Sequence, residues 1–160
     1  MNNLDACEFV WSALRNRRIE IGLRPIYRWL NRNSVRYHEC LVTCPGPDGR
    51  EMSAGEFVPA LEESGLIRLL DRHVFRRVVA LLNEQPELVV EVNVSALSAV
   101  VNVSWEAVFL SLSDDQNVAH RLVVVISKAA SVDASKVWAF AQRLQQLGCP
   151  VWFRDAIEVR

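Results

Sequence analysis

The densest group of residues that could do chemistry is a run of arginines near the amino terminus. Seven of them lie between positions 15 and 36, and Glu20 is the only acid in that interval. Guanidinium groups at this density can bind an anion or an acidic partner, although a solvated edge or an intersubunit surface has the same composition. The sequence leaves both interpretations open. The seven are Arg15, Arg17, Arg18, Arg24, Arg28, Arg32 and Arg36.

A second group combines Cys40, Cys44 and the neighbouring His38. On one β-strand the two cysteines would be roughly 13 Å apart, at about 3.3 Å per residue. Cα atoms joined by a disulfide lie within about 7 Å of each other, so we expect free thiols. The three side chains would share a face but stay widely spread, which disfavours a zinc site. Cysteine usage therefore predicts a reduced, cytoplasmic protein.

The bulk properties indicate one soluble globular domain over residues 1–160. The chain is 51% hydrophobic and 23% charged, which is enough to build a core. Its formal net charge of −1 argues against a nucleic-acid-binding protein, because such domains carry a strong basic excess. We find no apolar run of roughly 18–20 residues that could span a membrane, and no signal peptide at the amino terminus.

The elements that must position any site alternate between strand and helix periodicity. Such alternation predicts βαβ units and a parallel sheet covered by helices. The first two strands are joined by a short turn and should form an antiparallel pair. The expected helices are 4–16, one that stops near Gly65, 67–83, 104–112 and 134–147, with Gly148 as C-cap; the expected strands are 19–30, 35–42, 88–95, 121–127 and 150–153, and 44–53 is a predicted loop.

Five motifs, in order along nearly the whole chain, make this α/β prediction more specific. Through these motifs the chain resembles the EAL domain, the barrel phosphodiesterase that cleaves the bacterial messenger cyclic di-GMP. In that family the first two motifs are Gln-Pro-Ile and Glu-Ala-Leu, and the last ends in paired aspartates. The resemblance implies an α/β fold of the TIM-like (βα) barrel type. The motifs are LRPI (23–26), ECL (39–41), PDGREMSAGEFVPALEESGLI (47–67), VNVS (92–95) and LGCPVWFRDAI (147–157).

The resemblance also implies a site in which clustered carboxylates hold two metal ions. Glu39 and Asn93 retain two family ligands, and Asp155 retains the second of the paired aspartates. Other ligand positions have changed, because VISK carries Val125 and Lys128 in place of two acids and Arg154 replaces the first aspartate. A lost carboxylate and two added cations both oppose the binding of a dication. We therefore expect no metal, no cofactor and no catalytic residue.

The length of the chain leads to the same expectation. The family continues beyond the paired aspartates with a catalytic lysine, a further acid and the last strands and helices of the barrel, whereas this chain ends at Arg160. We therefore predict an incomplete barrel that is not an enzyme. An incomplete barrel would expose a strand edge and apolar surface. A protein partner, with a homodimer as the simplest case, would cover them.

Ligand binding without hydrolysis is the alternative. The family holds cyclic di-GMP through the glutamine of Gln-Pro-Ile and an arginine after Glu-Ala-Leu, and these positions are Arg24 and Thr43 here. Loss of that guanidinium removes a strong phosphate contact, so nucleotide binding is not our first expectation. We predict a non-enzymatic regulatory module that acts by protein–protein interaction in bacterial control of motility, biofilm or transcription. The alternative is a cyclic di-GMP receptor that uses the vestigial residues Arg24, Glu39, Asn93 and Asp155.

Structural roles for the same residues are also expected. Glu39 and Asn93 could hydrogen-bond to each other or to the backbone, and Ser95 could do the same. Glu62 and Glu63 read as a solvated face, and His73 reads as a surface residue of its helix. Phe57, Leu61 and Leu66 are predicted core residues. The five tryptophans fit either a core or an interaction surface; they are Trp11, Trp29, Trp105, Trp138 and Trp152.

Overall fold

The centre of the domain is a six-stranded sheet, seen in a computed structural model that describes residues 2–127 and 132–154. Its strands run in the order β1-β2-β4-β5-β6, with β3 paired to β2. β1 and β2 are antiparallel, whereas β2, β4, β5 and β6 are parallel. The strands are β1 (Glu20–Arg28), β2 (Asn31–Pro45), β3 (Glu51–Ser53), β4 (Val90–Ser95), β5 (Leu122–Ser127) and β6 (Val151–Arg154).

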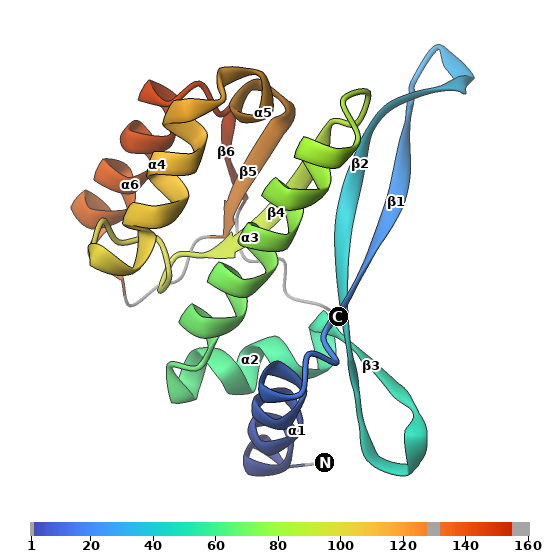
Figure 1. The fold of residues 1–160 in the computed structure, drawn as a ribbon. Helices are drawn as coiled ribbons and strands as arrows, with labels where there is room; N and C mark the ends of the chain where they lie inside the picture. The colour runs from blue at the N-terminus through green and yellow to red at the C-terminus, as the bar shows by residue number, and fades with distance from the viewer. Residues whose placement is uncertain (1, 128–131, 155–160) are drawn as a thin grey trace.

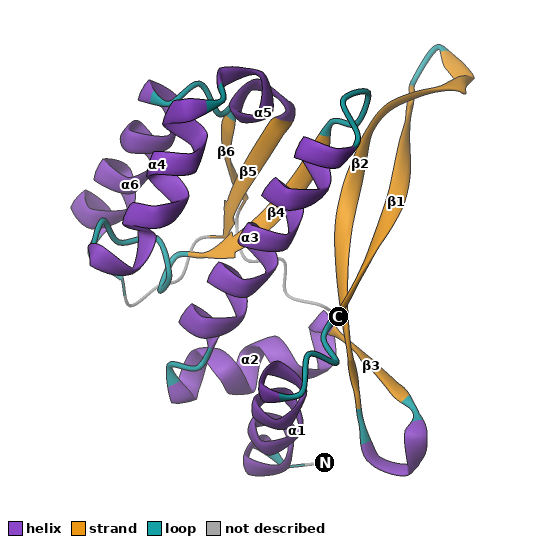
Figure 2. Cartoon of the chain, viewed as in Figure 1, coloured by secondary structure: helices purple, strands orange, loops and turns teal. Residues whose placement is uncertain are grey.

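The helices connect these strands and gather on one side of the sheet (Figures 1 and 2). The predicted α/β alternation is therefore confirmed. The longest helix, α3, packs along β4 and separates α1 and α2 from α4, α5 and α6 (Figure 1). The helices are α1 (Asn3–Arg15), α2 (Ala54–Ser64), α3 (Ile67–Glu84), α4 (Glu106–Asp114), α5 (Gln116–Arg121) and α6 (Ala134–Gln146), with short 3-10 turns at Pro47–Gly49 and Val103–Trp105.

Two elements depart from the sequence prediction. The predicted loop 44–53 contains β3, which exists because its three residues pair with β2. The helix α5 was not predicted, because six residues are too few to establish a helical period. Both elements depend on contacts with neighbouring segments rather than on local sequence.

The β1–β2 hairpin is longer than the rest of the sheet. Its register runs from Glu20 opposite Thr43 to Arg28 opposite Asn31, with irregularities after Ile26. The tip projects beyond the body of the domain (Figure 1). Trp29 and Leu30, at the turn, are each 95% exposed. The tip is therefore the most exposed apolar surface in the described residues.

Local signals explain where the helices start and stop. Ser53 and Glu56 form a capping box at the start of α2, and Gly65 ends that helix in the left-handed region at φ 78°. Gly148 follows α6 with φ 101°, and a Cβ there would lie 2.9 Å from Cδ2 of His120. Only glycine suits both that conformation and that space. The helix stops predicted at these two glycines are confirmed.

The core lies between the helices and the sheet. α3 turns Leu70, Val74 and Val78 inward, and these residues form an apolar stripe at spacings of four. The predicted core residues Phe57 and Leu61 are fully buried, and Leu66 is half-buried. Of the five tryptophans only Trp105 is in the core, and its indole Nε1 donates to the carbonyl of Ser98 at 3.0 Å. The ring of Trp105 packs against Phe75, Phe109 and Phe140.

None of the helices in the described residues is both long enough and apolar enough to cross a membrane.

Candidate functional site

Strand register brings the sequence-predicted site residues onto one face of the sheet. Arg24 on β1 is opposite Glu39 on β2, and Glu39 is opposite Glu91 on β4. Asn93 is two residues beyond Glu91 and therefore shares its face, since side chains alternate along a strand. We call the face that carries Arg24, Glu39, Glu91, Asn93 and Arg154 the polar face. Asp155 and Lys128 lie outside the described residues.

A cavity of about 420 Å³ opens beside this face. It is bounded by the carboxyl-terminal half of β2, the start of α2 and the inward side of α3. Arg24, Glu39, Thr43 and Asn93 line it. The fold therefore gathers three of the four predicted ligand-binding residues, Arg24, Glu39 and Asn93, around one space.

The carboxylate of Glu39 is held by an arginine. Arg24 donates from Nη2 to Oε2 of Glu39 at 2.5 Å. The Glu39 side chain is 14% exposed, whereas the Arg24 side chain is 58% exposed. The expected hydrogen bond between Glu39 and Asn93 is not observed. Glu39 pairs with Arg24 instead, because Arg24 is directly opposite it on β1.

A second arginine holds the other polar residues of β4. Arg154 donates to Oε1 of Glu91 at 3.1 Å and to Oδ1 of Asn93 at 3.5 Å. The Glu91 side chain is only 7% exposed, so this guanidinium supplies charge to a nearly buried carboxylate. Arg154 reaches across β5, which stands between β4 and β6. The sequence analysis did not identify Glu91 as a site residue. Its position as a charged residue within the apolar strand β4 could have indicated such a role.

The negative charge of Glu91 affects the pKa of its neighbour Tyr37. Partial burial raises the pKa of Tyr37, and the charge of Glu91 together with a side-chain hydrogen bond raises it further. A second cavity, of about 570 Å³, lies on the same side and includes Tyr37, Glu91, Trp152 and Arg154. Trp152 is 64% exposed there. The polar face thus combines paired charges with accessible aromatic surface.

Few carboxylates on the described part of this face are left unpaired to hold the two metal ions that the resemblance implies. Hard dications need several anionic oxygen ligands, but Glu39 is already paired with Arg24 and Arg154 contacts Asn93. Val125, which is opposite Asn93 on β5, is apolar and 2% exposed. Within residues 2–127 and 132–154, no group of three or more His, Cys, Asp or Glu side chains is arranged to hold a metal.

Ser95, at the end of β4, ties the site to two helices. Its hydroxyl donates to Oε1 of Glu62 on α2 at 2.6 Å, and its backbone N–H donates to Oδ2 of Asp71 on α3 at 2.9 Å. The expected hydrogen-bonding role of Ser95 is confirmed. The prediction that Glu62 is solvated is wrong, because this bond holds it half-buried, whereas Glu63 is exposed.

Asp71 is the most perturbed carboxyl group near the cavity. Burial raises its pKa to about 7, against the opposing effect of the hydrogen bond from the Ser95 backbone. Its side chain lies on the inward side of α3 and borders the 420 Å³ cavity. Asp71 therefore takes up a proton more readily than an exposed aspartate does.

Three of the four cysteines are not suited to nucleophilic chemistry. Cys40, Cys44 and Cys149 are buried, and burial raises the pKa of the first two to about 11 and of the third to about 12. Cys40 and Cys44 point away from the polar face, since they alternate with Glu39 and Leu41 along β2. The prediction of free thiols is confirmed for all four cysteines.

Parallel strands covered on one side by helices, with polar side chains collected on the other side, define part of a TIM-like α/β barrel. The chain belongs to the EAL domain family, whose model matches residues 10–156. The resemblance seen in the sequence motifs is therefore confirmed. A comparison with curated protein sequences finds no match.

Solved structures of EAL proteins share the fold. The chain is similar to Vibrio cholerae LapD S helix-GGDEF-EAL, with a TM-score of 0.79, 20% identity, and coverage of 96% of this chain and 37% of that chain. For the Pseudomonas aeruginosa FimX EAL domain bound to c-di-GMP, the TM-score is 0.73 with 24% identity and coverage of 93% and 61%. The PaMucR phosphodiesterase in complex with c-di-GMP also gives 0.73, at 20% identity and coverage of 91% and 61%. The chain thus spans about two fifths to three fifths of the length of these relatives.

Proposed function

We propose that this EAL domain is a non-enzymatic regulatory module of bacterial signalling that acts by binding a protein partner. The observation that carries this proposal is the pairing of both polar-face glutamates with arginines, Glu39 with Arg24 and Glu91 with Arg154. The guanidinium groups supply the positive charge that metal ions supply in a phosphodiesterase of this family. A site neutralised by its own side chains has little affinity left for a dication.

Exposed aromatic side chains support action through protein contacts. Trp29, Trp138 and Trp152 are 95%, 55% and 64% exposed. Tryptophan and arginine are the residue types that most often dominate the energetics of protein interfaces. Trp152 is on β6, an outermost strand of the described sheet, where a second copy or another protein could pack. A homodimer is the simplest such assembly.

Hydrolysis of cyclic di-GMP is the decisive test. We expect no linear product when the purified domain is incubated with cyclic di-GMP and magnesium or manganese, because the metal ligands are engaged by arginines. Chromatographic analysis of the nucleotide measures this directly. Metal-dependent turnover that disappears in the Glu39→Gln variant would contradict the proposal, and light scattering of the same sample would report the oligomeric state.

A nucleotide receptor is the second candidate, favoured by one observation. The 420 Å³ cavity is lined by Arg24, whose guanidinium is more than half exposed and could contact a phosphate. Calorimetric titration of cyclic di-GMP distinguishes the candidates. Saturable heat that is lost in Arg24→Ala would favour the receptor, whereas no heat with or without metal would favour the interaction module.

A further inference from the structure

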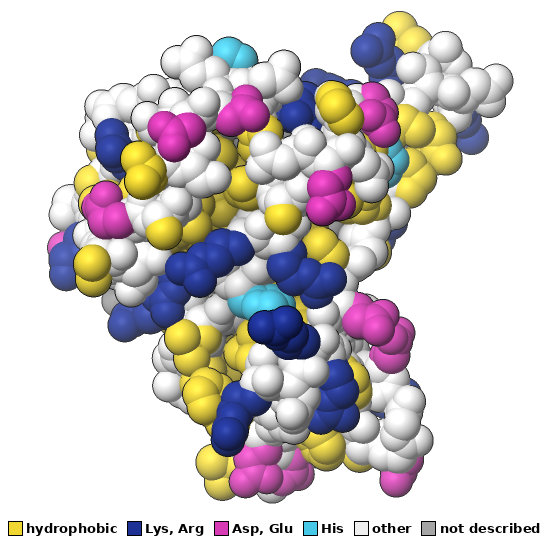
Figure 3. Space-filling model, viewed as in Figure 1, with side chains coloured by type: hydrophobic (Ala, Val, Ile, Leu, Met, Phe, Trp, Pro, Cys, Tyr) yellow, Lys and Arg dark blue, Asp and Glu magenta, His cyan; other side chains and the backbone are white. Residues whose placement is uncertain are grey.

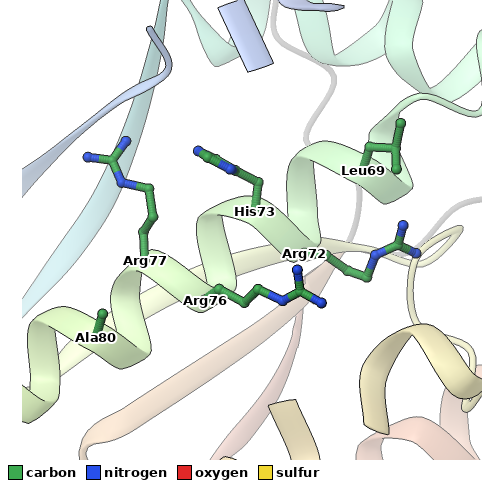
Figure 4. Close-up of a pocket in the computed structure, with 6 residues that line it drawn as sticks. All are labelled: Leu69, Arg72, His73, Arg76, Arg77 and Ala80. Atoms are coloured by element: carbon green, nitrogen blue, oxygen red, sulfur yellow. The ribbon is translucent and has the colours of Figure 1, made fainter. Parts of the chain in front are cut away.

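The outward side of α3 carries a cationic stripe that is unrelated to the polar face. Its six residues recur at spacings of three and four, which places them on one side of a helix. They border a shallow groove of about 280 Å³ (Figure 4). The stripe consists of Leu69, Arg72, His73, Arg76, Arg77 and Ala80.

The positive charge of this stripe is not neutralised by the described part of the chain. The ion pairs within the described residues join Arg24 to Glu39, Arg50 to Glu56 and Arg154 to Glu91. None of them includes an arginine of α3. Asp71, the only acid between Ile67 and Arg77, is buried on the opposite side of the helix. Lys and Arg side chains accordingly form a band around a histidine across this face of the molecule, where the surface is hollowed (Figure 3).

The four polar side chains of the stripe surround the groove from both sides. Arg72 and Arg76 leave α3 on one side, and His73 and Arg77 leave it on the other (Figure 4). Arg77 is held in place because it donates to the backbone carbonyl of Ile19. Arg76 and Arg77 thus bring two cations beside a groove that has apolar residues, Leu69 and Ala80, at its ends.

His73 gives the groove a polar atom that lacks a partner. Its Nε2 is buried and makes no hydrogen bond within the described residues. His73 lies on the outward side of its helix, as expected of a surface helix residue, but its side chain is half-buried. Burial lowers the pKa of His73, and the charges of Arg77 and Arg76 lower it further.

We propose that this groove is the docking site for an acidic segment of a partner protein. The inference rests on the interaction function proposed above and specifies the surface and the chemistry of the partner. Charge complementarity identifies the occupant. Guanidinium groups that pair with no described carboxylate favour an acidic ligand, and Leu69, which is 38% exposed, favours an apolar residue beside it. From Leu69 to Ala80 the stripe is roughly 16 Å long at 1.5 Å per residue, which fits a short peptide segment.

Nucleic acid is the less suitable polyanion. Proteins that follow a phosphate backbone carry a strong basic excess, whereas this chain has a net charge of −1. The apolar ends of the groove would also be unmatched by a phosphate chain. The test therefore compares a peptide with a duplex.

The experiment measures binding of a fluorescein-labelled peptide of about twelve residues, mainly glutamate with interspersed leucine, at low ionic strength where surface charges are weakly screened. The domain is compared with Arg72→Gln/Arg76→Gln. The matched control is Arg28→Gln/Arg32→Gln, which removes the same charge from the projecting hairpin, where both arginines are exposed. We expect at least about tenfold weaker binding by the α3 variant and less than about threefold by the control, because the charges act locally.

Three outcomes would overturn the inference: no peptide binding, equal losses in both double variants, or tighter binding of a short DNA duplex with the same dependence on Arg72 and Arg76. The assay contains no nucleotide messenger and no metal. Its failure therefore says nothing about hydrolysis, and turnover of cyclic di-GMP would contradict the proposed function without altering the peptide result. The two proposals can thus fail separately.

Discussion

Arginines are used in opposite ways on the two sides of this domain. On the polar face, Arg24 and Arg154 each meet a glutamate supplied by a neighbouring part of the sheet. On the outward side of α3, Arg72 and Arg76 border a groove and pair with no described carboxylate. The first arrangement uses the charge inside the protein, where it neutralises two glutamates of the polar face. The second leaves the charge available to another molecule.

The polar-face arginines and the α3 arginines should differ most in their contribution to the free energy of unfolding, and Arg154 should show the largest effect. Glu91 is 7% exposed in the natural domain and loses its cation in Arg154→Ala, so we expect a loss of about 2 kcal/mol in the free energy of unfolding. Arg24→Ala should cost less than about 1 kcal/mol, because that pair is more exposed. Urea denaturation near neutral pH measures both.

A double variant separates the loss of charge pairing from the loss of packing. Glu91→Gln combined with Arg154→Ala should be more stable than Arg154→Ala alone, because no unpaired charge remains buried. Equal stability of the single and double variants would mean that Arg154 contributes by packing and not by its charge.

The buried acid of α3 should make stability depend on pH. The pKa of Asp71 is raised from 3.8 to about 7 in the fold, so the folded state holds this proton more tightly than the unfolded state. Stability from this group is fully present below about pH 4 and is lost as the pH rises toward 7. Asp71→Asn should therefore be more stable than the natural domain by about 4 kcal/mol at pH 8 and nearly equal to it at pH 4.

Denaturation curves across this pH range provide the measurement for Asp71. Glu84→Gln is the matched control, since Glu84 is an exposed acid at the end of the same helix. It should leave the pH dependence of the free energy of unfolding unchanged. A similar slope in Asp71→Asn and in the natural domain would show that another group is responsible.

The smallest expected effect on stability belongs to the α3 groove. Arg72→Gln/Arg76→Gln should change the free energy of unfolding by no more than about 0.5 kcal/mol per site, because neither side chain forms an ion pair with a described residue. Thermal denaturation measures this value. A large loss would show that these arginines stabilise the fold, and the contrast between the two groups would then disappear.

Much of the fold could be predicted from the sequence because its signals are local. The apolar stripe of α3, the apolar runs of β4 and β5, and the stops at Gly65 and Gly148 each depend on residues close in the chain. The motifs predicted the family, and they identified Arg24, Glu39 and Asn93 as neighbours. The short helix α5 was not predicted, and β3 lies in a predicted loop. Both elements depend on contacts with neighbouring segments more than on local sequence.

The sequence by itself determined where the carboxylates and the cations are along the chain. Only the tertiary structure decided what those cations do. Arg24 pairs with Glu39 because strand register places them opposite each other, and Arg154 reaches Glu91 across β5. Arg72 and Arg76 project outward because the other side of α3 is buried against the sheet. The sequence determines which side chains are charged. Whether two of them form an ion pair depends on the distance between them, and the fold sets that distance for residues far apart in the chain.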